Sequence, residues 1–208
     1  MKISENIYSI KVGQLEVNCV IAVCPDTSEA VIFDPGDETE KISGYIEEKG
    51  FHPVMILNTH CHYDHIGAVE DLRKKYNIKF YIHEAEKEYS IDPEKNYSVM
   101  SDKKISIIPD ALFREGEILK FGNKQLKVIH TPGHTLGGCC FLIDNVLISG
   151  DTLFAGSVGR TDLYGGDTDT IINSVTKKLL TLPENTLVIP GHDRITSIGQ
   201  EKLFNPYF

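Results

Sequence analysis

The stretch Thr59-His60-Cys61-His62-Tyr63-Asp64-His65 decides the fold expected for this chain. It places three histidines and one aspartate within the six positions from 60 to 65. If the stretch is an extended loop, alternate side chains point the same way, so His60 and His62 can reach one metal ion. Asp64 and His65 are then displaced toward a second ion. Imidazole and carboxylate ligands suit zinc, iron and manganese. A polar loop that is rich in histidine by chance is the alternative interpretation.

Three further candidate ligands follow apolar, strand-like segments and a glycine. They are His134 in Pro132-Gly133-His134-Thr135, Asp151 in Ser149-Gly150-Asp151-Thr152 and His192 in Pro190-Gly191-His192-Asp193. A glycine in the turn lets the backbone approach an ion closely and directs the next side chain inward. Each of these residues alone is more often an ordinary loop residue. Together with the histidine cluster they complete two coordination spheres.

Apolar stretches of strand length lie on both sides of the cluster. The first half predicts strands at 7–12, 17–23, 30–34, 54–57 and 79–82, and helices within 37–50 and over 67–76. The second half predicts strands at 117–121, 125–130, 138–143, 146–149 and 186–189, and helices at 170–180 and in the tail from 197. Residues 90–108 predict an irregular loop with one helical turn.

Each half thus runs strands, helix, strand, and each half places histidine or aspartate at strand ends. This arrangement favours an α/β fold in which two mixed β-sheets lie face to face with helices outside, an αβ/βα four-layer sandwich. We expect a single domain over residues 1–208, since this length can bury a sizeable core.

Four motifs, in this order, resemble the metallo-β-lactamase superfamily: THCHYDH (59–65), PGHT (132–135), SGDTLF (149–154) and PGHD (190–193). The resemblance covers nearly the whole chain. It implies the metallo-β-lactamase fold and two divalent metal ions, with zinc expected and iron or manganese as alternatives. It also implies a first ion held by His60, His62 and His134, a second held by Asp64, His65 and His192, and Asp151 bridging both.

The segments Gly159-Arg160-Thr161-Asp162 and Gly165-Gly166-Asp167, and the tail from Thr196 to Pro206, resemble short glyoxalase II-like hydrolases. That resemblance implies a binuclear thioester hydrolase, similar to hydroxyacylglutathione hydrolase, that cleaves a thioester of a 2-hydroxy acid. We expect a metal-bridging hydroxide to attack the carbonyl, with Asp64 and Asp151 as the catalytic carboxylates. Full-length glyoxalase II has an additional C-terminal helical region, which is not expected here, so the thiol carrier stays open.

Three side chains are expected around the metals. Arg160 could bind a substrate carboxylate, orient Asp151, or form only a structural salt bridge, for example with Asp162. Tyr164, like Tyr63, could line the substrate pocket or simply pack. Asp34, in Phe33-Asp34-Pro35-Gly36, could hydrogen-bond a ligand histidine or act only as a turn former.

A persulfide dioxygenase of the same fold is the main alternative. It shares the His-Cys-His-x-Asp-His and Gly-Arg-Thr-Asp patterns and would hold a single iron with His60, His134 and Asp151. The tail, with Thr196-Ser197-Ile198-Gly199, resembles the hydrolase branch more closely. A β-lactamase would need export, a nuclease would need a basic surface, and a non-enzymatic member would have lost ligands or gained a flavin domain.

Composition narrows the partners and the compartment. The formal net charge of −9 argues against nucleic acid as a partner. The N-terminus has no signal-peptide pattern and no apolar run spans a bilayer, so we expect a soluble, cytoplasmic protein without a membrane partner. The five cysteines include no CxxC pair and are expected to be free thiols. Cys61, between two candidate ligands, should point away from the metals. A small-molecule thioester is the expected partner.

Overall fold

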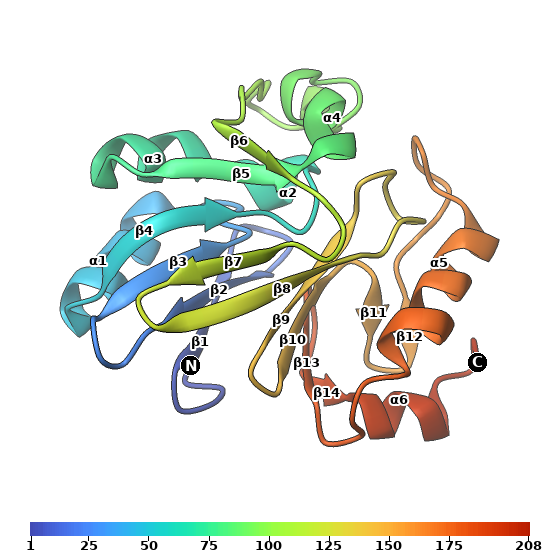
Figure 1. Cartoon of the computed structure of the whole chain (residues 1–208). Helices are drawn as coiled ribbons and strands as arrows, with labels where there is room; N and C mark the ends of the chain where they lie inside the picture. Colours follow the sequence, from blue (N-terminus) through green and yellow to red (C-terminus); the bar gives the residue numbers. More distant parts are fainter.

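The computed structural model describes residues 1–208 and contains two six-stranded sheets and a small two-stranded one. The first sheet contains the N-terminal half of the chain, in blue to green in Figure 1. Its strands lie in sequence order: β1 (Ile7–Val12), β2 (Val17–Val23), β3 (Glu29–Phe33), β4 (His52–Leu57), β5 (Lys79–His83) and β6 (Ala111–Phe113). Strands β1 to β3 pair antiparallel, and β3 to β6 pair parallel.

The second large sheet belongs to the C-terminal half. Its order is β14-β13-β10-β9-β8-β7, from β7 (Ile118–Phe121), β8 (Lys124–His130), β9 (Cys139–Ile143), β10 (Val146–Gly150), β13 (Leu187–Pro190) and β14 (Thr196–Ser197). The third sheet pairs β11 (Leu153–Phe154) with β12 (Ser157–Val158). Both large sheets mix parallel and antiparallel pairs.

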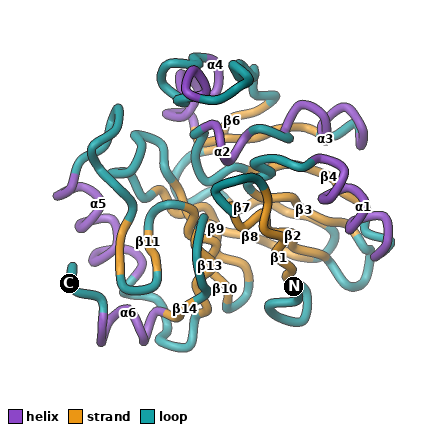
Figure 2. The backbone as a smooth tube through the Cα atoms, turned by 180° about the vertical axis from the view of Figure 1, so that it is seen from behind, coloured by secondary structure: helices purple, strands orange, loops and turns teal.

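Helices cover the outer face of each large sheet, on opposite sides of the molecule (Figures 1 and 2). Those on the first sheet are α1 (Thr39–Lys49) and α3 (Val69–Tyr76), which bury Ile42, Ile46 and Leu72 against it. The second sheet is covered by α5 (Thr168–Ser174), the π-helix η3 (Val175–Leu179) and α6 (Ile198–Phe204). The layers confirm the predicted αβ/βα sandwich.

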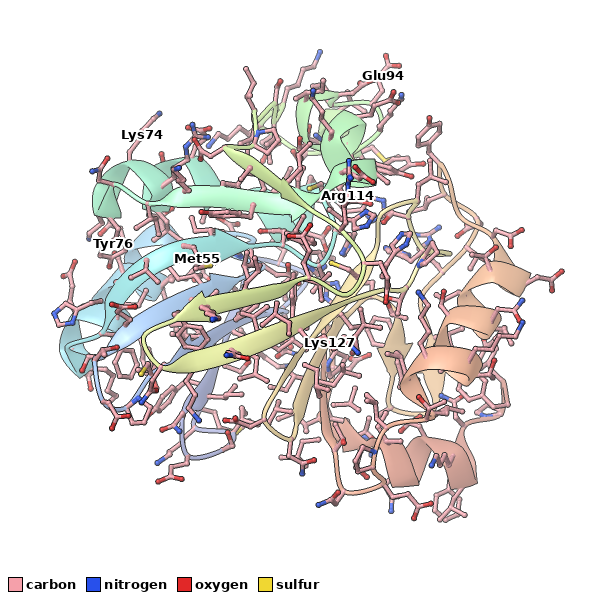
Figure 3. All side chains as sticks on the ribbon, in the orientation of Figure 1. Met55, Lys74, Tyr76, Glu94, Arg114 and Lys127 are labelled. Carbon is pink, nitrogen blue, oxygen red and sulfur yellow. The ribbon has the colours of Figure 1, made fainter.

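Alternation along the strands explains why the sheets stack. On β2, Val20 and Ala22 face the core between the sheets, while Cys19 and Ile21 face the helices. Phe33 and Phe141 meet across the two sheets with ring centroids 5.2 Å apart. Figure 3 shows side chains filling the space between the sheets. Burying these apolar side chains supplies the main driving force for this packing.

Strand direction brings the chemically important loops together. Strands β8 and β10 are each antiparallel to β9, so they point the same way, and β13 is parallel to β10. Their carboxyl ends therefore meet at one edge of the second sheet. The carboxyl ends of β3 and β4 lead into the loops that face this edge. This is the edge at which the candidate ligands emerge.

Several elements differ from the predictions. Part of the histidine stretch is helical, because α2 (Tyr63–Ile66) begins directly after His62. The predicted helix 170–180 begins earlier, where the Asp167 side chain caps the Thr170 amide, and ends as the π-helix η3. In the middle of the chain, α4 (Lys87–Ile91) and the 3-10 helices η1 (Glu84–Glu86) and η2 (Ser98–Met100) form. The short strands β6, β11, β12 and β14 have too few residues for a pattern of alternation to reveal them.

The longest helix of the fold, α1, has 11 residues, and no helix has the length and apolar character needed to cross a membrane.

Candidate metal centre

All seven predicted ligands lie at the edge where strands of the two sheets end. His60 and His62 lie in the loop after β4, and Asp64 and His65 lie on α2, which follows that loop directly (Figure 1). The remaining three follow β8, β10 and β13 in turn: His134, Asp151 and His192. Their convergence depends on both sheets, because four candidates come from the first half of the chain and three from the second.

The side chains form groups with metal-site spacing. Donor atoms of His60, His62 and His134 lie within 4.8 Å of one another. The same limit holds for Asp64, His65 and His192. We call His60, His62 and His134 the first set, and Asp64, His65 and His192 the second set. They correspond to the two ligand groups that the sequence resemblance implies.

Asp151 lies between the two sets. Its Oδ1 atom is 3.5 Å from His65 Nε2, in the second set. Its Oδ2 atom is 3.6 Å from His134 Nε2, in the first set. That atom is also 3.7 Å from His192 Nε2. One carboxylate thus faces both sets.

Backbone carbonyls orient two of the imidazoles. The Nδ1 atom of His134 donates to the Arg160 carbonyl and that of His192 donates to the Leu15 carbonyl, each at 2.8 Å. A carbonyl can only accept, so Nδ1 carries the proton and Nε2 keeps its lone pair. Such contacts fix the tautomer and ring orientation of metal-binding histidines.

Burial and neighbouring charges set the protonation states. Burial, followed by the nearby imidazoles, lowers the pKa of His60 well below its ordinary value and that of His62 to about 3. Burial opposes the charged form of Asp151, yet neighbouring histidines outweigh it and lower its pKa. Neutral His60 and His62 and an ionised Asp151 are the forms that bind metal. Against the effect of burial, the neighbouring carboxylates raise the pKa of His65 and His192, so a metal ion would displace a proton from these two.

Glycines allow the close approach of these loops. A Cβ atom at position 191 would lie 2.1 Å from Asp151 Oδ1 and 2.8 Å from His65 Cε1, so a side chain there would displace the cluster. Gly150 has φ +48°, and a Cβ there would lie 2.2 Å from Thr59 Oγ1. Both observations agree with the predicted role of glycine before a ligand.

The chemistry of the cluster fits divalent metal ions. Six buried side-chain polar atoms have no hydrogen-bond partner, and five of them belong to the cluster: His60 Nε2, His62 Nε2, His65 Nδ1 and Nε2, and Asp151 Oδ1. An unpartnered buried polar atom costs about 1–3 kcal/mol. Metal ions coordinated by the three Nε2 atoms and by Asp151 Oδ1 would remove that cost, whereas His65 Nδ1 faces a carboxylate oxygen of Asp34 at 3.1 Å. Cys61 belongs to none of the metal-like groups and packs in the core beneath the helices.

A cavity of about 490 Å³ opens over the cluster. Apolar and aromatic side chains share its walls with the candidate ligands: Leu15, Tyr63, Tyr97, Met100 and Leu163. Arg160 also lines it, but its guanidinium forms a bidentate ion pair with Asp162 at 2.7 and 2.8 Å. Tyr164 does not line this cavity, because its ring packs against Tyr89.

Leu15, Tyr97 and Met100 were not predicted as part of the site. Leu15 lies in the turn between β1 and β2, and the other two lie in the irregular segment that includes η2. No motif marks these positions. For Tyr97 and Met100, the one sequence signal was the predicted irregular loop over 90–108.

Comparisons with known proteins agree with this geometry. A model of the metallo-beta-lactamase superfamily matches residues 12–192. The chain is 40% identical over 201 residues to a probable metallo-hydrolase, YqgX, of Bacillus subtilis (strain 168), with 94% of both chains covered. It is 36% identical to the hydroxyacylglutathione hydrolase GloC of Haemophilus influenzae, with 97% of both covered.

Two crystal structures are also similar. The BLEG-1 B3 metallo-beta-lactamase gives a TM-score of 0.92 at 38% identity, covering 97% of this chain and 98% of that one. TTHA1623 in a di-iron-bound form gives 0.84 at 32% identity, covering 97% and 100%.

Proposed function

The chain belongs to the metallo-β-lactamase superfamily, and from that membership we propose that this metal-dependent hydrolase is a binuclear, glyoxalase II-like thioesterase. Its substrate would be a small-molecule thioester of a 2-hydroxy acid. The similarity to a hydroxyacylglutathione hydrolase over nearly the full length of both chains supports this substrate class.

The position of Asp151 carries the proposal of two metal ions. Its carboxylate lies 3.5 to 3.7 Å from histidines of both sets, where a ligand shared by two ions would lie. The similar structure in a di-iron-bound form supports the same count. Zinc is the metal we propose, with iron or manganese as alternatives, because imidazole and carboxylate ligands suit all three.

Two divalent ions held there would supply a water of lowered pKa and polarise the thioester carbonyl. The protein's own contribution is orientation and exclusion of bulk water. Asp64 lines the cavity, and its Oδ2 atom lies 3.2 Å from His192 Nε2, so this carboxylate is placed beside the site where it could receive a proton from the attacking water. The apolar walls at Leu15, Tyr97 and Met100 would surround the acyl group.

A persulfide dioxygenase is the second candidate, and one observation favours it. His60, His134 and Asp151 would supply two histidines and one carboxylate, the ligand type of mononuclear iron oxygenases. The rings of His60 and His134 lie 4.8 Å apart, and His134 Nε2 is 3.6 Å from Asp151. In that case a single iron would be held by His60, His134 and Asp151.

Parallel assays on one preparation test the proposal. Rates are measured for hydrolysis of S-lactoylglutathione, for hydrolysis of a β-lactam and for oxygen uptake with glutathione persulfide. We expect thioester hydrolysis to dominate, to be lost in His134→Ala and to persist in His52→Ala, which changes an exposed histidine. Persulfide-dependent oxygen uptake without thioester hydrolysis would favour the dioxygenase instead.

A further inference from the structure

Glu86 is a buried carboxylate outside both sets of candidate ligands. It ends the 3-10 helix η1, directly after β5, and has an exposed fraction of 0%. Burial raises the pKa of Glu86 to about 7. A buried carboxylate is costly unless it is well hydrogen-bonded, so its partners indicate why it is there.

The hydrogen bonds of Glu86 join the two loops that carry the first set. Oε2 accepts from the backbone N–H of Cys61 at 2.8 Å, and Cys61 lies between His60 and His62. Oε1 accepts from the Thr135 hydroxyl at 2.6 Å and from the Gly137 N–H at 2.9 Å. Thr135 directly follows His134. One carboxylate thus connects the backbone around all three members of the first set.

The loop after β8 is shaped to approach Glu86. A Cβ atom at position 137 would lie 2.7 Å from the Glu86 amide nitrogen and 2.8 Å from its Cγ. Glycine at this position therefore allows the contact. A second tie lies one helical turn further on, where the Tyr89 hydroxyl accepts from the Leu136 N–H at 3.3 Å.

We propose that Glu86 is a positioning residue for the metal centre, which holds the His60–His62 loop and the His134 loop at the spacing that the first metal ion needs. The inference rests on the proposed metal centre and deepens it. Every partner of Glu86 donates, which suits a carboxylate with acceptors on both oxygens. A carboxamide has one acceptor oxygen, so in either orientation one backbone N–H would face another donor.

Glu86→Gln is the test, and Glu201→Gln is its matched control. Glu201 is 3% exposed and also accepts three hydrogen bonds, from the Gly156 amide, the Thr196 hydroxyl and the Asn205 side chain. None of these partners adjoins a candidate ligand. The readouts are the zinc dissociation constant by chelator competition, the visible absorption of the cobalt-loaded protein, and thermal unfolding without metal.

We expect Glu86→Gln to weaken zinc binding at one site by about 10- to 100-fold and to change the cobalt spectrum. Glu201→Gln should leave the zinc affinity and the cobalt spectrum unchanged. Each of the two variants should lower the thermal stability of the metal-free protein. Unchanged zinc affinity in Glu86→Gln would show that Glu86 serves packing alone and would overturn the inference.

If Glu86→Gln does not fold, Glu86→Asp takes its place. The shorter carboxylate keeps the charge but cannot reach both loops, so weaker zinc binding is again expected and wild-type affinity would contradict the inference. Zinc affinity does not depend on the substrate, so a failure of the thioesterase proposal leaves this result readable. A wild-type protein that binds no divalent metal would instead contradict the metal centre itself.

Discussion

The Nδ1 atom of His65 lies 3.1 Å from a carboxylate oxygen of Asp34, and both side chains are buried. The same carboxylate accepts from the Thr59 amide at 2.8 Å and from its hydroxyl at 2.7 Å. Asp34 therefore connects the end of β3 with the start of the histidine cluster. Of the two roles considered for Asp34, the structure places it against a histidine of the second set.

Asp34→Asn should weaken metal binding by about 10- to 100-fold, the usual effect of losing a partner of a ligand histidine. The reason is that an amide cannot supply two acceptor oxygens to Thr59 and His65. Asp144→Asn is the matched control, because Asp34 and Asp144 both have positive φ, 48° and 50°, a conformation that asparagine tolerates. Chelator competition measures both variants. Equal affinities in both would contradict an orienting role for Asp34.

The two sets should lose their metals separately. His192→Ala removes a member of the second set and should leave about one equivalent of metal, held by the first set and Asp151. His62→Ala removes a member of the first set and should leave about one equivalent of metal, held by the second set and Asp151. Elemental analysis after dialysis gives the stoichiometry of each variant. A protein that keeps two equivalents in both variants would show that the sets are assigned wrongly.

Cys61→Ala should leave the metal content unchanged and lower the free energy of unfolding by about 1–2 kcal/mol. Cys61 is buried in the core beneath the helices, and its thiol belongs to no metal-like group. Urea denaturation and elemental analysis of the same sample check both parts. Loss of an equivalent of metal would make the thiol a ligand.

His83 should make the protein less stable in mild acid. Burial, and then the imidazole of His130 stacked 4.1 Å away, lower the pKa of His83 to about 4. The unfolded chain takes up this proton near pH 6.5, so the stability from His83 is present above that pH and is lost as pH falls toward 4. The other charged groups that act on His83 are Glu84, Glu115 and Lys178.

His83→Asn isolates this effect, because asparagine can still accept from the Ala85 amide as His83 does. Urea unfolding from pH 7 to pH 4 should show a loss smaller by roughly 2–3 kcal/mol in the variant than in the wild type. His52→Asn, at an exposed position, should follow the wild type. The same pH dependence in His83→Asn would exclude His83 as the cause.

The sequence predicted most of the fold because the long strands carry clear patterns. Strands β1 and β2 were predicted at their observed bounds, since Tyr8, Ile10 and Val12 alternate along β1 and every residue of β2 except Asn18 is apolar. Helix α2 was missed because it is four residues long and its sequence is dominated by candidate ligands. The π-helical end of α5 leaves no mark in the spacing of apolar residues.

Residues with distinctive chemistry were also predictable, and the walls of the cavity were not. His134 and Asp151 could be identified because histidine and aspartate after a glycine at a strand end are unusual in combination. Met100 lines the cavity although it is ordinary in sequence, since its place depends on how the 90–108 segment folds over the cluster. Tyr164 lies outside the cavity for the same reason, as its position depends on packing with Tyr89.

Two metal ions are expected to lie on either side of Asp151. Anomalous diffraction at the absorption edge of the bound metal, on crystals of protein purified without added metal, tests it most directly. We expect two peaks, one contacting His60, His62 and His134 and the other contacting Asp64, His65 and His192, with Asp151 contacting both. Metal bound without His60, His134 and Asp151, or a single peak that persists when metal is in excess, would contradict it.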